Sequence, residues 1–268
     1  MRIHFVVHES FEAPGAFEQW AKHRGYGIGY SRLYAGEALA ETIDDIDMLI
    51  VMGGPQTPDT TTAECPHFDA QAESRVIAAC IDADRAVIGV CLGAQLIGEA
   101  LGARFEHSPE TEIGSFPITL TADGLASDRF AGFERSFHVG HWHNDMPGLT
   151  AESKVLATSA GCPRQIVEYG PLVYGFQCHM EFNRTVVEGL IEHAADELVA
   201  LSERRFVQPP EELRRNGYDA MNDMLFTFLD RLTADYAQRA PGTSGQGASR
   251  RSRPGTTWFV TIRQAAGC

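Results

Sequence analysis

The sequence lacks long apolar runs: none of its 268 residues lies in a stretch approaching the roughly 18 apolar residues of a membrane-spanning helix. Residues 1–7 carry one charge and a short apolar stretch without a small-residue cleavage site, so we expect a first strand there and not a signal peptide. The six cysteines are scattered and form no C-x-x-C pair. These absences exclude a membrane-spanning protein and predict a cytoplasmic chain with free thiols.

Basic residues are fewer than acidic ones, 22 against 36, which gives a formal net charge of −14. That balance weighs against a nucleic-acid partner and against binding to an anionic membrane surface. Residues 237–268 reverse the balance, with five arginines, no Asp or Glu, a Gly/Ser-rich stretch and a short strand pattern at residues 257–262. We predict one folded domain, residues 1–239, and a flexible basic tail, residues 240–268.

Apolar runs of strand length alternate with helical patterns in the first part of the chain. Because consecutive strands are separated by helices, the alternation predicts an α/β fold with a mostly parallel central sheet and helices on both faces. The strands are expected at residues 3–7, 47–52 and 86–90, and the helices at residues 17–23, 68–81 and 93–101.

The middle of the chain has short strand patterns separated by turn residues, with no helical pattern between them. Such consecutive strands predict antiparallel pairs added to the parallel core. They are expected at residues 113–121, 136–141, 155–160, 165–169 and 172–177. Two helices, at about residues 184–202 and 211–237, are expected to complete the domain.

The segment AVIGVCLGA, residues 86–94, places a cysteine between a strand and a helix. The G-x-C-x-G pattern of Gly89, Cys91 and Gly93 in this context is typical of a nucleophile elbow, a tight turn that needs small residues on either side. The helix N-terminus that follows favours a thiolate. The alternative is a structural cysteine buried in a small-residue turn.

The segment GFQCHME, residues 175–181, follows another apolar run. His179 and Glu181 are two residues apart, so an extended chain points them to the same side. Glu181 could then fix the imidazole and give a thiol, a base and an orienting acid. The alternative is an isolated His–Glu pair on the surface.

The paired glycines Gly53 and Gly54 directly follow the strand at residues 47–52. Their backbone N–H groups can approach a ligand closely, and with the N–H of Leu92 they could form an oxyanion hole. The alternative is an ordinary turn before Pro55. The nearby histidines 138, 141 and 143 are expected on mixed faces of a strand-to-loop stretch, and we predict no metal site there.

Together, the three segments resemble the class I (triad) glutamine amidotransferases, and the resemblance covers roughly residues 3–200. It is closest to the stand-alone type that is similar to the amidotransferase domain of GMP synthase. The order of the segments matches that family, and two further stretches support it: Glu112-Ile113-Gly114 and His141-Trp142-His143-Asn144-Asp145. The resemblance implies a flavodoxin-like three-layer fold for the domain at residues 1–239.

The resemblance also implies residue roles. Cys91 would attack the side-chain amide of glutamine and form a γ-glutamyl thioester, His179 would protonate the departing ammonia and then activate water, and Glu181 would orient His179. The backbone of Gly54 and Leu92 would hold the oxyanion. The substrate would be bound by Gly53, Gln95, Trp142, Asn144 and Asp145, the last three on a loop that closes the pocket.

Two positions depart from the family pattern. Cys178 stands where the family has a bulky apolar residue, and Met180 stands where it has proline. We expect Cys178 to fill the core and face away from the site. The loss of proline removes a fixed φ between His179 and Glu181, so their geometry needs other support.

No cofactor is implied, and the expected ligand is glutamine or a related γ-glutamyl small molecule. The chain has no G-x-x-x-x-G-K-[ST] phosphate loop, so any coupled amidation requires a separate synthetase subunit. Two alternatives stay open: a stand-alone γ-glutamyl hydrolase, and a non-catalytic or redox module of the same fold.

Overall fold

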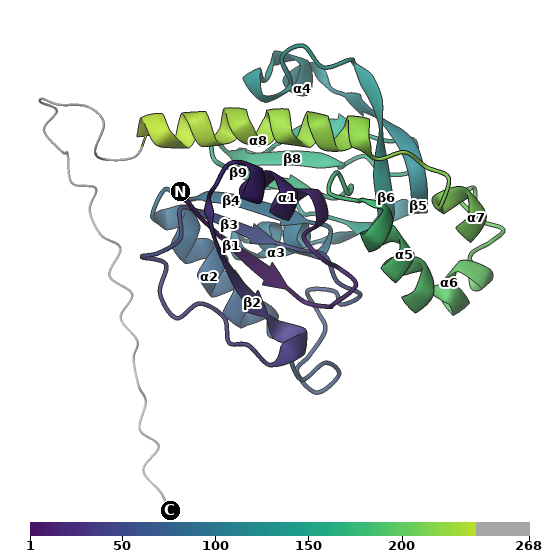
Figure 1. Cartoon of the computed structure of the whole chain (residues 1–268), viewed down its shortest axis with the longest axis horizontal. Helices are drawn as coiled ribbons and strands as arrows, with labels where there is room; N and C mark the ends of the chain where they lie inside the picture. The colour runs from purple at the N-terminus through teal and green to yellow at the C-terminus, as the bar shows by residue number, and fades with distance from the viewer. Residues whose placement is uncertain (240–268) are drawn as a thin grey trace, which may run out of the picture.

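The computed structural model describes residues 1–239. The predicted tail, with its strand pattern at residues 257–262, lies outside the described residues. The described chain forms a ten-stranded sheet in the order β10-β5-β7-β8-β9-β4-β3-β1-β2, with β6 pairing with β5 outside this path. Figure 1 shows helices packed against the two faces of this sheet. The predicted α/β fold class is thereby confirmed.

Five neighbouring strands form the parallel part of the sheet, in the order β9-β4-β3-β1-β2. β3 and β4 are apolar and fully buried, as expected for strands that are covered on both faces. The bounds are β1 (Arg2–Val7), β2 (Gly27–Arg32), β3 (Met48–Val51), β4 (Ala86–Val90) and β9 (Val173–Phe176).

The other strands extend the sheet beyond β9. β5, β6, β7 and β8 pair antiparallel with one another, and β10 adds to β5 in parallel. The bounds are β5 (Glu106–Leu120), β6 (Ser136–Met146), β7 (Lys154–Thr158), β8 (Ile166–Gly170) and β10 (Phe206–Val207). β9 was expected among the antiparallel additions; it pairs antiparallel with β8 but parallel with β4, so it joins the two parts of the sheet.

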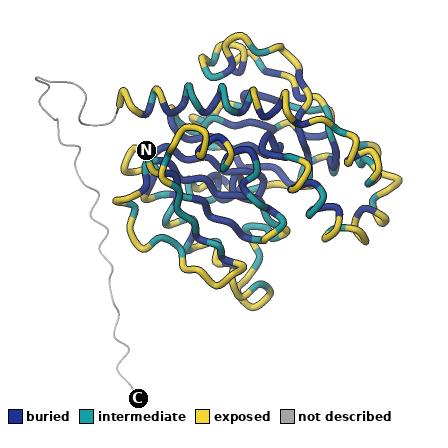
Figure 2. Tube along the Cα trace, in the orientation of Figure 1, coloured by how far each residue is buried: buried dark blue, intermediate teal, exposed yellow. Residues whose placement is uncertain are grey.

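Side chains of β1 alternate between the two faces, and each face has its own core. Phe5 packs in the cluster that includes Trp20 of α1 and Leu225 of α8, while Val6 packs in the cluster with Leu96 of α3. Figure 2 shows the buried strands enclosed by exposed outer helix faces and loops. The helices are α1 (Gly15–His23), α2 (Ala70–Asp82), α3 (Leu92–Ala100), α4 (Ala122–Ala126), α5 (Arg184–His193), α6 (Ala195–Ala200), α7 (Pro210–Leu213) and α8 (Asp219–Arg239), with 3-10 turns at Leu33–Ala35 and Asp128–Phe130.

Several predicted boundaries are wrong. The helix expected at residues 184–202 breaks at Ala194, which leaves helical geometry and separates α5 from α6. The helix expected at residues 211–237 divides into α7 and α8. The stretch at residues 142–145, expected to be a loop, is instead part of β6, because β5 is long enough to pair with it.

Candidate active site

Cys91 lies at the carboxyl end of β4, directly before α3, in a strained backbone conformation with φ 51° and ψ −108°. Its N–H donates to the carbonyl of Phe176 at 2.7 Å, which ties the turn to the end of β9. A Cβ on Gly89 would lie 2.2 Å from the carbonyl oxygen of Gly93, and a Cβ on Gly93 would lie 2.1 Å from that of Val51. Only glycine fits at these two positions, as a nucleophile elbow requires.

His179 and Glu181 follow β9, the strand beside β4, so they lie at the same edge of the sheet as Cys91. The Nδ1 of His179 donates to a carboxylate oxygen of Glu181 at 2.7 Å, and both side chains are buried. The imidazole of His179 stacks on Phe182 with ring centroids 4.3 Å apart. The backbone of His179 forms two hydrogen bonds with the backbone of Gly140. These contacts fix the ring where the missing proline would otherwise have helped.

The pKa of His179 is set by opposing effects. Burial lowers it, but the Glu181 carboxylate and the Cys91 thiol raise it, and the result lies well above the ordinary value for histidine. Because Nδ1 is engaged by Glu181, Nε2 is the nitrogen left for proton transfer, and it has no hydrogen-bond partner among residues 1–239. The arrangement can hold an imidazolium next to a thiol.

Gln177 is a contact of the thiol that sequence reasoning missed. Its Nε2 donates to the Sγ of Cys91 at 3.3 Å, and its Oε1 accepts from the Nε2 of Gln95 at 3.2 Å. The thiol also approaches the carbonyl of Trp142 at 3.7 Å. Gln177 lies inside the GFQCHME segment, so its position beside His179 was the available signal. Cys178, in contrast, is buried with its Sγ directed to the carbonyl of Gln165.

The turn at Gly53 and Gly54 lies against the elbow. A Cβ on Gly53 would be 3.4 Å from the Cβ of Cys91, and one on Gly54 would be 3.1 Å from Leu92 Cδ2. His8, which sequence reasoning missed, donates from Nδ1 to the carbonyl of Gly53 at 2.9 Å, and its Nε2 pairs with Glu73 at 2.8 Å. Burial lowers the pKa of His8, but Glu73, the Gly53 carbonyl and Glu12 together raise it by more. The contacts of His8 with Gly53 and Glu73 tie the turn to α2.

A cavity of about 430 Å³ opens beside Cys91. It brings together most of the residues expected to contact substrate, namely Gly54, Gln95, Trp142, Asn144 and Asp145. Gly53, Leu92, His179 and Glu181 lie behind its surface rather than on it. A second wall was not predicted, because it comes from the turn after β1 and from the segment spanning α5 and α6; it consists of Phe11, Glu12, Leu190, His193, Ala194 and Glu197.

Among residues 1–239, two groups of side chains have ligand atoms close enough to surround a cation. In the first, His141 Nδ1 and His143 Nε2 lie 3.6 and 3.5 Å from Oε2 of Glu112, across β5 and β6. His141 and His143 therefore share the buried face of β6, whereas His138 lies on its exposed side, so the prediction that the three histidines lie on mixed faces is confirmed. Burial lowers the pKa of His141 to about 3, and the Glu112 carboxylate already accepts hydrogen bonds from the side chains of Ser159 and Gln165.

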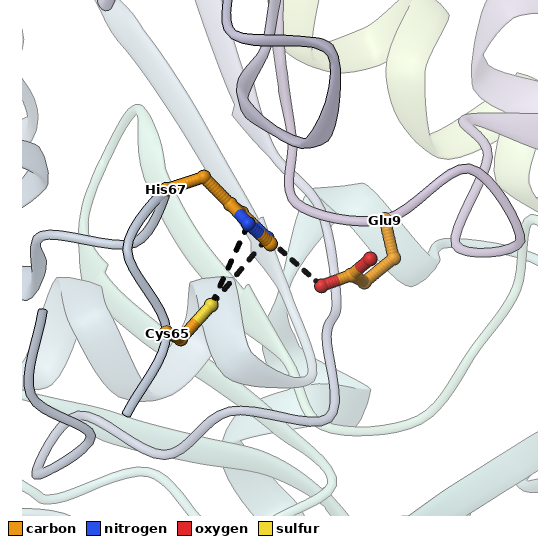
Figure 3. Close-up of side chains that lie close together, drawn as sticks. All are labelled: Glu9, Cys65 and His67. Atoms are coloured by element: carbon orange, nitrogen blue, oxygen red, sulfur yellow. Dashed lines mark hydrogen bonds and ion pairs between the residues drawn. The ribbon is translucent and has the colours of Figure 1, made fainter. Parts of the chain in front are cut away.

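The second group is half-exposed and lies outside the parallel strands. Figure 3 shows His67 between Cys65 and Glu9, with Nε2 at 3.4 Å from the Cys65 sulfur and 3.0 Å from the Glu9 carboxylate. Gln56, a residue of the cavity wall, donates to the same carboxylate at 2.7 Å. The group thus braces the turn that carries Gly54.

No helix among residues 1–239 is both long and apolar enough to cross a membrane.

Comparisons with known proteins agree with the geometry. The family model described as glutamine amidotransferase class-I matches residues 13–193. The glutamine amidotransferase-like protein YfeJ of Salmonella typhimurium is 57% identical over 239 residues, which cover 89% of this chain and 100% of that protein. One subunit of the glutamine-hydrolyzing GMP synthase of Thermococcus kodakarensis is 28% identical over 152 residues, 55% of this chain and 70% of that protein.

Solved structures share the fold. The crystal structure of SMU.1228c has a TM-score of 0.85 and 49% sequence identity, and covers 87% of this chain and 100% of that one. A glutamine amidotransferase from Thermotoga maritima has a TM-score of 0.76 at 22% identity, with 87% and 97% covered. At that identity the second comparison supports the fold alone.

Proposed function

The chain belongs to the class I glutamine amidotransferase family, and from this premise we propose that Cys91 is the nucleophile of a γ-glutamyl amide hydrolase. Family membership supports hydrolysis of the glutamine side-chain amide in general. The observation that carries the residue assignment is the strained turn of Cys91 beside the buried His179–Glu181 pair, whose nitrogen and oxygen are 2.7 Å apart. We assign the catalytic domain to residues 1–239, because every proposed site residue lies within it.

The proposed reaction has two steps. The Cys91 thiolate attacks the side-chain carbonyl carbon of the γ-glutamyl amide, and the N–H groups of Gly54 and Leu92 stabilise the oxyanion. His179 gives its Nε2 proton to the leaving nitrogen, the C–N bond breaks, and ammonia departs from a γ-glutamyl thioester. Water then gives a proton to Nε2 of His179 while its oxygen attacks the thioester carbonyl carbon, the C–S bond breaks, and glutamate leaves as the Cys91 thiolate and the His179 imidazolium are restored.

The labelling of cysteines by a chloroketone analogue of glutamine tests this assignment. Cys91 is only 7% exposed, whereas Cys65 is half-exposed and has no catalytic role in the proposal. If solvent exposure alone governs alkylation, the reagent modifies Cys65 first. If binding of the reagent in the cavity and activation of the thiol govern alkylation, it modifies Cys91 first. We expect mass spectrometry of the intact and digested chain to find the label on Cys91, with protection by L-glutamine. Label on Cys65 with unmodified Cys91 would refute the assignment.

The replacement Glu181→Gln should move the alkaline limb of the kcat/KM profile to lower pH. The Glu181 carboxylate raises the pKa of His179, so without its charge the imidazolium loses its proton at lower pH. Because the leaving nitrogen needs that proton, we also expect kcat to fall about 10- to 100-fold. Initial rates between about pH 5 and 10 measure both effects.

Glu192→Gln provides the matched control, because it removes the same charge from an exposed position on α5 outside the cavity. Its profile should overlay that of the unaltered protein. An alkaline limb that is unchanged in Glu181→Gln would mean that Glu181 does not set the protonation of His179.

A further inference from the structure

Glu12 is a buried carboxylate on the unpredicted wall of the cavity. It follows β1, is 7% exposed and lines the cavity beside Cys91. From the point where a Cβ on Gly53 would lie, Oε2 of Glu12 is 2.8 Å away and the Cβ of Cys91 is 3.4 Å away. The carboxylate therefore lies next to the proposed nucleophile.

This carboxylate has no partner within residues 1–239: it accepts no hydrogen bond and forms no ion pair. The other buried acids near the site each have one oxygen in an ion pair, Glu73 with His8 and Glu181 with His179, while their second oxygens have no hydrogen-bond partner among the described residues. Both histidines lie close enough to act on the charge of Glu12, but each is already engaged by its own carboxylate. Burial raises the pKa of Glu12, because its charge has no hydrogen-bond or ion-pair partner among the described residues, and a cation that arrives with the ligand would supply that partner.

The charged residues of the cavity wall indicate whether the ligand group that meets Glu12 is a cation or an anion. Of the residues that the structure describes, neither Lys nor Arg lines the cavity, whereas Glu12, Asp145 and Glu197 do. Asp145 pairs with His107 at 2.6 Å, and Glu197 is exposed, so Glu12 is the buried acid that stays uncompensated. A wall of this kind favours a cationic group over a neutral or anionic one.

The cavity also has room beyond a glutamine side chain. Its volume of about 430 Å³ lies in the range that takes drug-sized ligands, which are larger than glutamine. Phe11 stacks on His193 with ring centroids 4.0 Å apart, and Leu190 lines the same wall, so this wall carries apolar surface as well as the carboxylates of Glu12 and Glu197. An alkyl chain that ends in an ammonium group matches an apolar wall flanked by carboxylates.

We propose that this cavity selects γ-glutamyl amides of alkyl diamines and polyamines, with Glu12 as the specificity residue that pairs with the ammonium group of the leaving amine. The inference rests on the proposed function of Cys91. The reaction balances as before: the amide C–N bond breaks, His179 protonates the departing nitrogen, the amine leaves with its second nitrogen still charged, and water converts the thioester to glutamate.

The test compares two ligands of nearly equal size that differ in charge. The cationic probe is the mono-γ-L-glutamyl amide of 1,4-diaminobutane, and the neutral probe is γ-L-glutamyl-n-pentylamide, in which a methyl group replaces the ammonium. Calorimetric titration of Cys91→Ala measures affinity without turnover, and kcat/KM of the unaltered chain measures selection in the reaction. We expect the cationic probe to be preferred by about 10- to 100-fold in both.

The Glu12→Gln replacement keeps the shape of the side chain and removes its charge, so it should reduce the cationic-to-neutral ratio to near one. Glu192→Gln removes the same charge from outside the cavity and should leave the ratio unchanged. Equal affinity of Cys91→Ala for the two probes, or no binding of either, overturns the inference even if Glu12→Gln fails to fold. A preference that persists in Glu12→Gln overturns the assignment to Glu12.

The outcomes for the inference and for the proposed function are separable. If the unaltered chain hydrolyses L-glutamine and the neutral probe as well as the cationic one, Cys91 catalysis stands and the cation preference fails. If Cys91→Ala binds the cationic probe selectively but the unaltered chain hydrolyses no amide, the binding preference stands and the proposed function fails.

Discussion

Replacement of Cys91 by alanine is expected to lower kcat for γ-glutamyl amide hydrolysis by about 10³-fold or more. The thioester cannot form without the sulfur, and His179 and the oxyanion donors can then promote only direct attack by water. Ammonia release from L-glutamine, measured with the purified chain alone, gives the rate. The folding of the variant must be checked, because Cys91 has a strained backbone conformation that alanine, like any residue with a Cβ, adopts less readily than glycine. Circular dichroism and thermal melting provide this check.

Cys80→Ala is the matched control because it removes the same atom from another buried cysteine, on α2 and outside the cavity. Its kcat should stay within about twofold of the unaltered value, although its stability falls by the cost of a small cavity. Equal activity in Cys91→Ala would exclude covalent catalysis at this position. It would leave the fold as a non-catalytic module.

The rate of the unaltered chain decides between two forms of the proposed function. A subunit that depends on a synthetase partner would release little ammonia alone, whereas a stand-alone hydrolase would turn over steadily. Steady turnover without a partner would rule out an obligate subunit.

The elbow was predictable from sequence because its requirements are local. Gly89 and Gly93 lie two residues from Cys91 on either side, and the apolar run before them and the helical pattern after them fix the turn between a strand and a helix. The same holds for His179 and Glu181, whose two-residue spacing at a strand end is enough to bring them together. Such features need no knowledge of which strands are neighbours.

The second wall of the cavity was not predictable, because nothing local connects its parts. Glu12 and Leu190 are far apart in sequence and meet only because β1 and β9 end at the same edge of the sheet, where α5 begins shortly after Glu181. β2 was missed for another reason: the segment GIGYSR contains two glycines and is only partly buried, so it has neither the apolar run nor the alternation of a typical strand.

The replacement Gly93→Ala is expected to destabilise the chain by about 3 kcal/mol or more, at the upper end of the cost of overpacking. The added Cβ would lie 2.1 Å from the carbonyl oxygen of Val51 and 3.1 Å from that of Met52, and both are backbone atoms. Relief therefore requires α3 to move away from the end of β3. For a domain of this size, that free energy corresponds to a fall in Tm of roughly 10 °C, measurable by calorimetry.

Gly217→Ala adds the same methyl group where no atom lies within 4 Å, so it should change stability by less than about 0.5 kcal/mol. A Gly93→Ala variant that melts like the unaltered protein would show that the contact between α3 and β3 is loose enough to admit a methyl group.

The displacement of α3 should also reduce activity in the molecules that stay folded, because the N–H of Leu92 and the carboxyl end of β3 that leads to Gly54 lie on the two sides of that contact. Loss of stability with full activity would therefore argue against an oxyanion hole built from Leu92 and Gly54.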